Sequence, residues 1–266
     1  MIRRFILIGL LVNFILYPVS FLQENEFTNL VGMEFLLIQP GTFMMGALPG
    51  CADCEADESP AHRVTIGRAF YIGRFEVTQE QWQLVMGSNV SKFKNWKNIQ
   101  KNHGYQNHPI ENVSWLDVQE FLKKLNQIEL TSTYRLPTEA EWEYVRRAGG
   151  GPIHLSEEVG EIDDYAWYED NSKLKTHPVG KKKPNIWGLY DLEGNVSEWC
   201  QDWYDEAYYR HSPENDPAGP ESGLSKVFRG SNWGSIPAYT RATDRLRLPP
   251  NYQLWTIGFR VVKEIR

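Results

Sequence analysis

The cysteines are the residues of this chain with the most direct chemical potential. Cys51 and Cys54 are separated by two residues, a spacing shared by redox-active dithiols and by half of many zinc sites, whereas Cys200 is remote. No second cysteine pair follows, and His62 is a weak additional zinc ligand. Because the pair lies in an acidic loop, negative charge opposes formation of a reactive thiolate. We therefore expect a local disulfide or two inert thiols.

Other catalytic patterns give no signal. The six histidines show no pair at metal-ligand spacing, and the sequence has no Gly-Lys phosphate loop, Gly-x-Ser-x-Gly elbow or Rossmann fingerprint. The formal net charge of −6 disfavours nucleic acid and anionic membranes as partners. We expect the basic run at 181–183 to be a solvated loop, and we expect no nucleic-acid partner.

Short strands near the N-terminus are the first elements that must position these residues. Residues 33–46 predict a hairpin around Pro40-Gly41, because β-branched and aromatic residues flank a Pro-Gly turn. Residues 58–66 lead to residues 70–78, whose partial alternation and β-branched content again favour strands.

Three helices are predicted by their N-terminal signals. Thr78, Ser114 and Thr138 are each followed three residues later by a residue that can complete a capping box, or at least place an acid in the first turn. The expected helices cover residues 79–86, 115–125 and 139–144. No repeat or linker divides the chain, which contains 21 Gly and 15 Pro in total. We interpret residues 27–266 as one α+β domain with little regular structure.

Eight motifs occur in a fixed order along the chain. They are residues 40–46 (PGTFMMG), 76–78 (EVT), 109–115 (PIENVSW), 134–144 (YRLPTEAEWEY), 177–180 (HPVG), 184–199 (PNIWGLYDLEGNVSEW), 228–233 (FRGSNW) and 257–260 (IGFR). In this order and spacing the chain resembles the sulfatase-modifying-factor, or formylglycine-generating enzyme, family over nearly its whole length. The resemblance implies a C-type-lectin-like α+β fold with a small antiparallel sheet, few short helices and long ordered loops.

Charged and aromatic residues inside the motifs have an expected structural role. Guanidinium–carboxylate pairs can tie loops together, and we expect this of Arg135, Glu141, Arg229 and Arg260. Trp199 and Trp203 are expected in the core, because large aromatic rings supply much burial to a loop-rich chain.

The expected catalytic positions depart from the family. In its oxidases a cysteine pair binds copper(I), and oxygen chemistry converts a substrate cysteine into formylglycine. By resemblance the two cysteine places fall on Ser235 and Thr240, whose hard hydroxyls are poor ligands for a soft cuprous ion. Asn232 replaces the serine of the motif, whereas Tyr239 matches the tyrosine between the two cysteines. We expect no copper site of the known kind.

The same resemblance implies a structural calcium site. Its ligands would be the side chains of Asp191 and Glu198 and the backbone carbonyls of Gly194 and Val196. Such an oxygen set suits Ca²⁺, and glycine permits the tight backbone path. An ordinary turn without a metal is the alternative. The second calcium site of the family is expected to be lost, because Trp167 stands where an asparagine ligand is expected.

The N-terminus predicts export. Arg3 and Arg4 precede an apolar run over 5–16 that ends before Pro18, which is typical of a secretory signal. We interpret residues 1–22 as a signal peptide or an N-terminal anchor. The protein is then extracytoplasmic, periplasmic or secreted, with membrane attachment only if the segment stays uncleaved.

Two functions follow from these observations. The first is an exported, non-oxidase family member that binds a peptide, a glycan or a partner protein through the substrate groove of the family, around residues 232–239. The second is a formylglycine-generating-type or other protein-maturation or tailoring oxidase with a non-standard active site. The sequence leaves open whether the protein is an enzyme.

Overall fold

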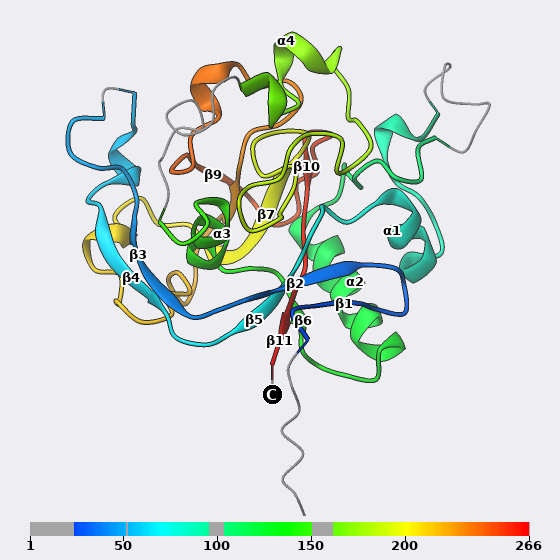
Figure 1. Cartoon of the computed structure of the whole chain (residues 1–266), viewed down its shortest axis with the longest axis horizontal. Coiled ribbons are helices and arrows are strands. Elements are labelled where there is room, and N and C mark those ends of the chain that lie inside the picture. Colours follow the sequence, from blue (N-terminus) through cyan, green and yellow to red (C-terminus); the bar gives the residue numbers. More distant parts are fainter. Residues whose placement is uncertain (1–23, 52, 96–103, 151–161, 266) are drawn as a thin grey trace, which may run out of the picture.

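A computed structural model describes residues 24–51, 53–95, 104–150 and 162–265 (Figure 1). The predicted signal or anchor segment, residues 1–22, lies outside the described residues. The strands are β1 Glu26–Thr28, β2 Glu34–Ile38, β3 Gly41–Met45, β4 His62–Ile66, β5 Phe70–Gly73, β6 Tyr134–Arg135, β7 Ser197–Trp203, β8 Lys226–Arg229, β9 Arg245–Leu248, β10 Ile257–Gly258 and β11 Val262–Glu264.

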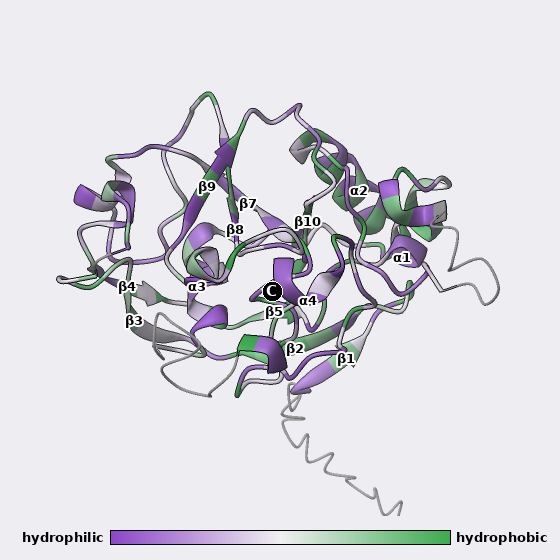
Figure 2. Cartoon of the chain, turned by 90° about the horizontal axis from the view of Figure 1, so that it is seen from above, coloured by the Kyte–Doolittle hydropathy of each residue, from purple (hydrophilic) through white to green (hydrophobic). Residues whose placement is uncertain are grey.

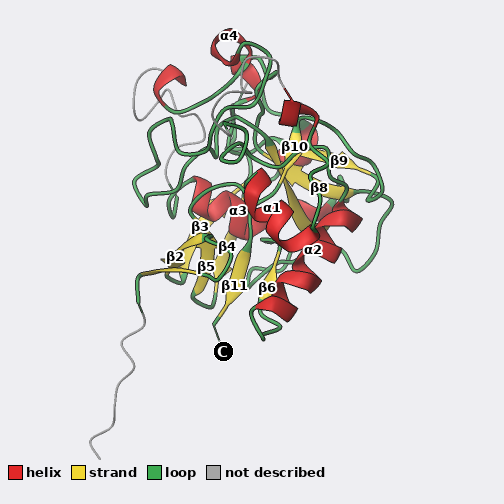
Figure 3. Ribbon diagram, turned by 90° about the vertical axis from the view of Figure 1, so that its right-hand side faces the viewer, coloured by secondary structure: helices red, strands yellow, loops and turns green. Residues whose placement is uncertain are grey.

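The helices are short and few. The α-helices are α1 Gln79–Met86, α2 Trp115–Ile128, α3 Glu139–Arg146 and α4 Glu169–Ser172, and the 3₁₀ turns are η1 Ala56–Glu58, η2 Lys92–Asn95, η4 Ile162–Asp164, η5 Tyr208–Arg210 and η6 Pro237–Tyr239. Figure 3 shows the strands of the largest sheet and α2 at one end of the molecule and long loops with α4 at the other. The predicted α+β class is confirmed.

Three sheets organise the strands. The largest is antiparallel, with the order β1-β2-β5-β11-β6. A second has the order β10-β7-β8-β9, in which β10 runs parallel to β7, and β3 pairs with β4 in a third. The C-terminal strand β11 therefore lies between β5 and β6 and is an inner strand of this sheet.

The predicted hairpin over residues 33–46 is wrong, although both of its strands exist. β2 pairs with β1 and β5, whereas β3 pairs with β4, so the chain passes from one sheet to another at Pro40. Tight packing accompanies this passage: a Cβ on Gly41 would lie 2.1 Å from the hydroxyl of Tyr144. The predicted strand over 70–78 is also shorter, because β5 ends at Gly73.

The three predicted helices are confirmed, and their capping boxes form. The hydroxyls of Thr78, Ser114 and Thr138 each accept a hydrogen bond from the backbone N–H three residues later. α2 is longer than expected and ends at Ile128, with both apolar and polar residues along it (Figure 2). Its apolar side buries Phe121 and Leu125, and the Phe121 ring stacks on Trp82 of α1 at 5.3 Å between ring centroids.

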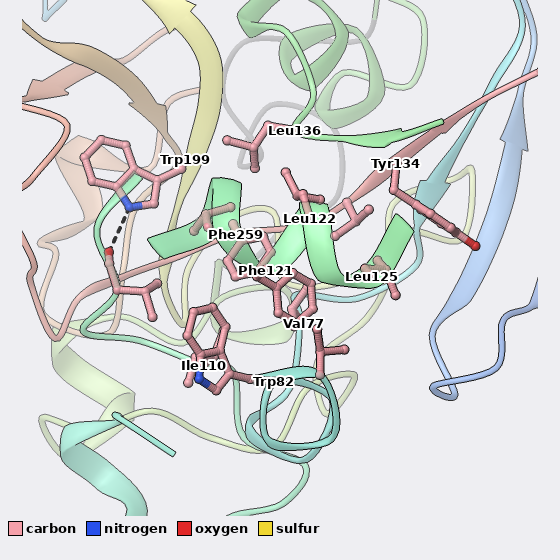
Figure 4. Packing of buried hydrophobic residues seen from close by; sticks show 14 of the residues in the cluster. Val77, Trp82, Ile110, Phe121, Leu122, Leu125, Tyr134, Leu136, Trp199 and Phe259 are labelled. Atoms are coloured by element: carbon pink, nitrogen blue, oxygen red, sulfur yellow. Dashed lines mark hydrogen bonds between the residues drawn. The ribbon is translucent and has the colours of Figure 1, made fainter. Parts of the chain in front are cut away.

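Aromatic rings from distant segments fill the main core (Figure 4). Trp199 of β7 is fully buried, as predicted, and its indole N–H donates to the carbonyl of Val113 at 3.0 Å. Trp203, at the end of the same strand, is only half-buried. Among the described residues, no helix is long and apolar enough to cross a membrane.

Candidate functional site

The predicted site residues 232–240 follow β8 in one looped segment. The chain turns out of the strand at Gly230, whose φ is +79° and where a Cβ would lie 3.0 Å from the Trp142 ring. Asn232 then fixes the loop: its amide N–H₂ donates to the Ser197 hydroxyl at 3.2 Å, and its side-chain oxygen accepts from the N–H of Gly234 at 3.0 Å. The start of the segment is thus bonded to β7.

The two hydroxyls at the predicted cysteine positions serve the local turn. The Ser235 hydroxyl accepts a hydrogen bond from the backbone N–H of Asn232 at 3.0 Å. The Thr240 hydroxyl donates to the carbonyl of Pro237 at 2.7 Å and so closes η6. Both groups therefore stabilise the loop that contains them, and this role needs no metal.

Exposed aromatic residues lie in this loop and beside its start. Tyr239 is 52% exposed and Trp255 is 47% exposed. The indole N–H of Trp233 donates to the carbonyl of Trp255 at 3.1 Å, and the buried Phe93 packs edge-on against Trp233 at 5.6 Å between ring centroids. The ammonium of Lys92 lies 5.3 Å from the centroid of the Trp255 ring. Three segments, which contain Phe93, Trp233 and Trp255, thus form one aromatic surface beside the start of the loop.

A buried carboxyl group holds the η2 side of this surface. Glu111 is fully buried; its Oε1 accepts from the N–H of Phe93 at 3.0 Å, and its Oε2 has no hydrogen-bond partner among the described residues. Burial raises the pKa of Glu111 to about 7. The neighbouring Asn112 ties the surface from the other side, since its N–H donates to the carbonyl of Leu254.

An ion pair that anchors the segment 232–240 was not predicted from the sequence motifs. Arg241 is 4% exposed; its Nη1 donates to the carbonyl of Ala238 at 3.0 Å, and its Nη2 donates to Glu58 at 2.7 Å. Asp244 also accepts from Arg241. The position of Arg241 directly after the predicted site residue Thr240 was the one sequence signal for this pair. Its partner Glu58 lies 183 residues away and could not be inferred.

The two carboxylates predicted as calcium ligands, Asp191 and Glu198, differ in whether their oxygens already have hydrogen-bond partners. Asp191 is buried with φ +60°; its Oδ2 accepts from the N–H of Gly180 at 2.7 Å, and its Oδ1 has no hydrogen-bond partner among the described residues. Burial raises the pKa of Asp191 to about 6. Both oxygens of Glu198 instead bind Arg260 at 2.6 Å, and Oε2 also accepts from the Trp142 indole.

A third carboxyl group lies next to these two. Burial, with the charges of Asp191 and Glu198, raises the pKa of Glu76 well above its usual value. Glu76 accepts hydrogen bonds from the side chain of Asn195 and from the N–H of Val196. No cluster of three or more His, Cys, Asp or Glu side chains in the described part of the chain is arranged to hold a metal ion. At the predicted calcium site, Asp191 thus offers one oxygen without a hydrogen-bond partner among the described residues, whereas Arg260 holds both oxygens of Glu198.

Gly194 and Trp167, which also entered the calcium prediction, lie next to each other. A Cβ on Gly194 would lie 2.3 Å from the carbonyl oxygen of Trp167, which explains the glycine. Trp167 stacks on His177 at 3.7 Å between ring centroids, and the Lys182 ammonium lies 4.0 Å from the centroid of the indole. Trp167 thus packs between the His177 ring and the Lys182 ammonium group. Lys183 pairs with Asp164 at 2.7 Å, so Lys182 and Lys183 of the basic run are engaged within the chain.

The motif arginines have the structural role that we predicted. Arg135 binds both oxygens of Glu141 at 2.7 Å. Arg229 is fully buried and binds Glu139 and Glu143, each at 2.7 Å. These pairs connect α3 to β6 and to β8.

The cysteine pair adopts the first of the two expected states, a local disulfide. Cys51 and Cys54 are bonded, with 5.5 Å between their Cα atoms, and Cys200 is a buried free thiol.

Comparison with known proteins identifies the family. The sulfatase-modifying factor enzyme 1-like domain matches residues 23–265. A serine/threonine-protein kinase of Chlamydia pneumoniae is 32% identical over 252 residues, which are 87% of this chain and 38% of the kinase. A formylglycine-generating enzyme of Streptomyces coelicolor is 34% identical over 178 residues, 60% of this chain and 54% of the enzyme. The chain thus spans about half or less of the length of these relatives.

A solved structure has the same fold. Treponema denticola variable protein 1 superposes with a TM-score of 0.78 at 31% identity, and the match covers 91% of this chain and 99% of that one. The C-type-lectin-like fold of formylglycine-generating enzymes, predicted from the motifs, is therefore confirmed. The chain belongs to the sulfatase-modifying factor, or formylglycine-generating enzyme, family.

Proposed function

We propose that this protein is a non-oxidase member of its family that binds a polypeptide segment through the surface around Asn232, Ser235, Tyr239 and Thr240. The exposed aromatic surface is the observation that carries the proposal. Tyr239 and Trp255 expose about half of their area, and Ile236, in the same turn as Tyr239, is 44% exposed. Exposed Tyr and Trp side chains in contact with a rigid scaffold are frequent anchors of protein interfaces.

The polar groups of this surface favour a polypeptide over a glycan. A glycan needs free donors and acceptors for its hydroxyls, beside an aromatic ring. Asn232, Ser235 and Thr240 use their side chains for hydrogen bonds within the protein. Apolar side chains of a peptide need no such partners, because the gain comes from burying apolar area.

Peptide selection tests the proposal. A displayed library of short peptides is selected on the immobilised full chain, and binding of the recovered peptides is measured for Tyr239→Ala and Trp255→Ala. We expect each substitution to weaken binding at least tenfold. Leu130→Ala is the matched control, since Leu130 is 93% exposed and follows α2. Glycan capture without peptide capture, or equal binding by all three variants, would overturn the proposal.

An oxidase function is the second candidate, favoured by the similarity to formylglycine-generating enzymes. It is tested with copper(I) and a cysteine-containing sulfatase peptide, with aldehyde as the readout. We expect no aldehyde from the unmodified chain, because hydroxyls bind a cuprous ion poorly. The double variant Ser235→Cys with Thr240→Cys is expected to gain copper affinity. Robust aldehyde formation by the unmodified chain would establish the oxidase instead.

A structural calcium ion remains part of the proposal. The unpartnered, buried Oδ1 of Asp191 supports it, together with the backbone carbonyls of Gly194 and Val196; Glu198 would contribute once Arg260 released one of its oxygens. Such a hard cation would neutralise carboxylate charge and hold the loop. We expect excess chelator to lower the melting temperature of the unmodified protein and to leave that of Asp191→Asn unchanged. Equal melting curves of the unmodified protein with and without chelator would count against calcium.

A further inference from the structure

We propose that the Cys51–Cys54 disulfide is exchangeable, and that its redox state controls the order of the segment 236–244. The inference concerns regulation of the surface described above and rests on the proposed binding function for its biological meaning. It stands on the position of the disulfide, which nothing in the binding function uses.

The disulfide lies against the chain that follows the predicted site. The Cys54 sulfur is 4.0 Å from the hydroxyl of Thr243, three residues after Thr240. Both cysteines are half-buried, so a small dithiol can reach the bond. A disulfide that closes so short a loop removes little entropy from the unfolded chain, and stability alone is therefore a weak reason for it.

A continuous set of bonds leads from the disulfide to η6. The N–H of Glu55, the residue after Cys54, donates to Glu58 Oε1 at 2.8 Å. The same carboxylate oxygen accepts from Arg241 Nη2, and Arg241 Nη1 donates to the carbonyl of Ala238 in η6. The disulfide thus fixes the residue that orients Glu58, and Glu58 orients the arginine that holds Ala238.

The rest of η1 is anchored independently, which confines the effect. The carbonyl of Asp57 accepts from Arg245, and the carbonyl of Glu58 accepts from the N–H of Ala47. Opening the disulfide would therefore free Cys54 and Glu55 without detaching η1 from the core. The expected consequence is a weaker Glu58–Arg241 pair and a less ordered η6.

The exchange reaction is a two-electron transfer to the disulfide. A thiolate of a small dithiol attacks one cysteine sulfur, the Sγ–Sγ bond breaks, and a mixed disulfide forms. The second thiol of the reagent then displaces the cysteine thiolate. Cys51 and Cys54 gain two electrons and two protons in total, and the reagent becomes a cyclic disulfide.

The test uses the full chain, oxidised, without any ligand. The folded protein is incubated with dithiothreitol and alkylated, and the modified cysteines are identified by mass spectrometry. Hydrogen exchange of residues 236–244 is measured in both redox states. We expect alkylation of Cys51 and Cys54 but not of the buried Cys200, and at least threefold faster exchange of 236–244 after reduction.

Three variants separate the possible causes. Cys51→Ser with Cys54→Ser should reproduce the fast exchange without reductant, and Glu58→Gln should do so with the disulfide intact. Cys200→Ser is the control that should keep the redox response. Absence of alkylation in the folded state, or unchanged exchange on reduction, would overturn the inference. Because no ligand is used, this result is independent of whether the peptide selection succeeds.

Discussion

Buried carboxyl groups of this protein differ in their pKa values although they are equally buried. The difference comes from their charged partners. Glu139 is fully buried, but the guanidinium groups of Arg245 and Arg229 outweigh the cost of burial and lower its pKa to about 2. Asp202 is equally buried, and its pKa is raised to about 8 by burial and by the charge of Glu139. Glu111 resembles Asp202, because burial also raises its pKa, to about 7. Two guanidinium groups at contact distance thus keep the buried Glu139 charged at neutral pH.

Glu111 should make the protein less stable at alkaline pH. Its pKa is about 7 in the folded state and 4.5 in the absence of the fold, so the folded state holds the proton more tightly. The stabilising effect is complete below pH 4.5 and is lost as the pH rises through 7, with a total of about 3 kcal/mol. Glu111→Gln keeps an acceptor for the N–H of Phe93 and cannot ionise.

Chemical denaturation at pH 5 and pH 8 measures this effect. We expect Glu111→Gln to be more stable than the unmodified protein at pH 8, and we expect the difference to shrink at pH 5. Groups such as Asp202 titrate in both proteins and cancel in the comparison. A difference that does not change with pH would show that Glu111 is ionised, or already neutral, throughout.

At the scale of elements, local sequence signals predicted the helices, whereas the pairing of strands distant in sequence was predicted wrongly. Each capping box lies within four residues, so Thr78, Ser114 and Thr138 predicted three helices with nearly correct bounds. The partner of β3 lies some twenty residues away, and no local pattern distinguishes β4 from β2 as that partner. The predicted hairpin failed for this reason.

The loop between Asp191 and β7 is an element whose shape depends on one glycine. A Cβ at Gly194 would lie 2.3 Å from the Trp167 carbonyl, a backbone atom that cannot move aside easily. We expect Gly194→Ala to cost about 3 kcal/mol and to lower the melting temperature by roughly 5–10 °C. Gly234→Ala is the control, because a Cβ there meets only Asn232 Oδ1 at 3.5 Å. Equal melting temperatures for the two variants would contradict the close approach.

At the scale of the whole molecule, the motifs were sufficient to predict the fold. The contacts between distant residues that build the site could not be predicted. The order of eight motifs predicted the fold, and the arginines inside them were correctly assigned to structural roles. Their partners were not predictable, since Arg229 meets Glu139 and Glu143 about ninety residues earlier. Trp255 and Phe93 were missed at the site because only the folded chain places them beside Trp233.

The disulfide and the N-terminus together lead to a prediction about the location of the whole protein. Disulfides persist in oxidising compartments, and the basic residues and apolar run of segment 1–22 are typical of an export signal. We expect the full chain, expressed in a bacterium with two membranes, to reach the periplasm with Cys51 and Cys54 oxidised. A chain without residues 1–22 should remain in the cytosol with both thiols reduced, and Arg3→Glu with Arg4→Glu should slow export. Cell fractionation with thiol alkylation measures both properties, and Cys200 serves as an internal thiol that stays reduced in each fraction. Unprocessed full-length protein in the cytosol, with free Cys51 and Cys54, would refute export and would leave the disulfide without the compartment that maintains it.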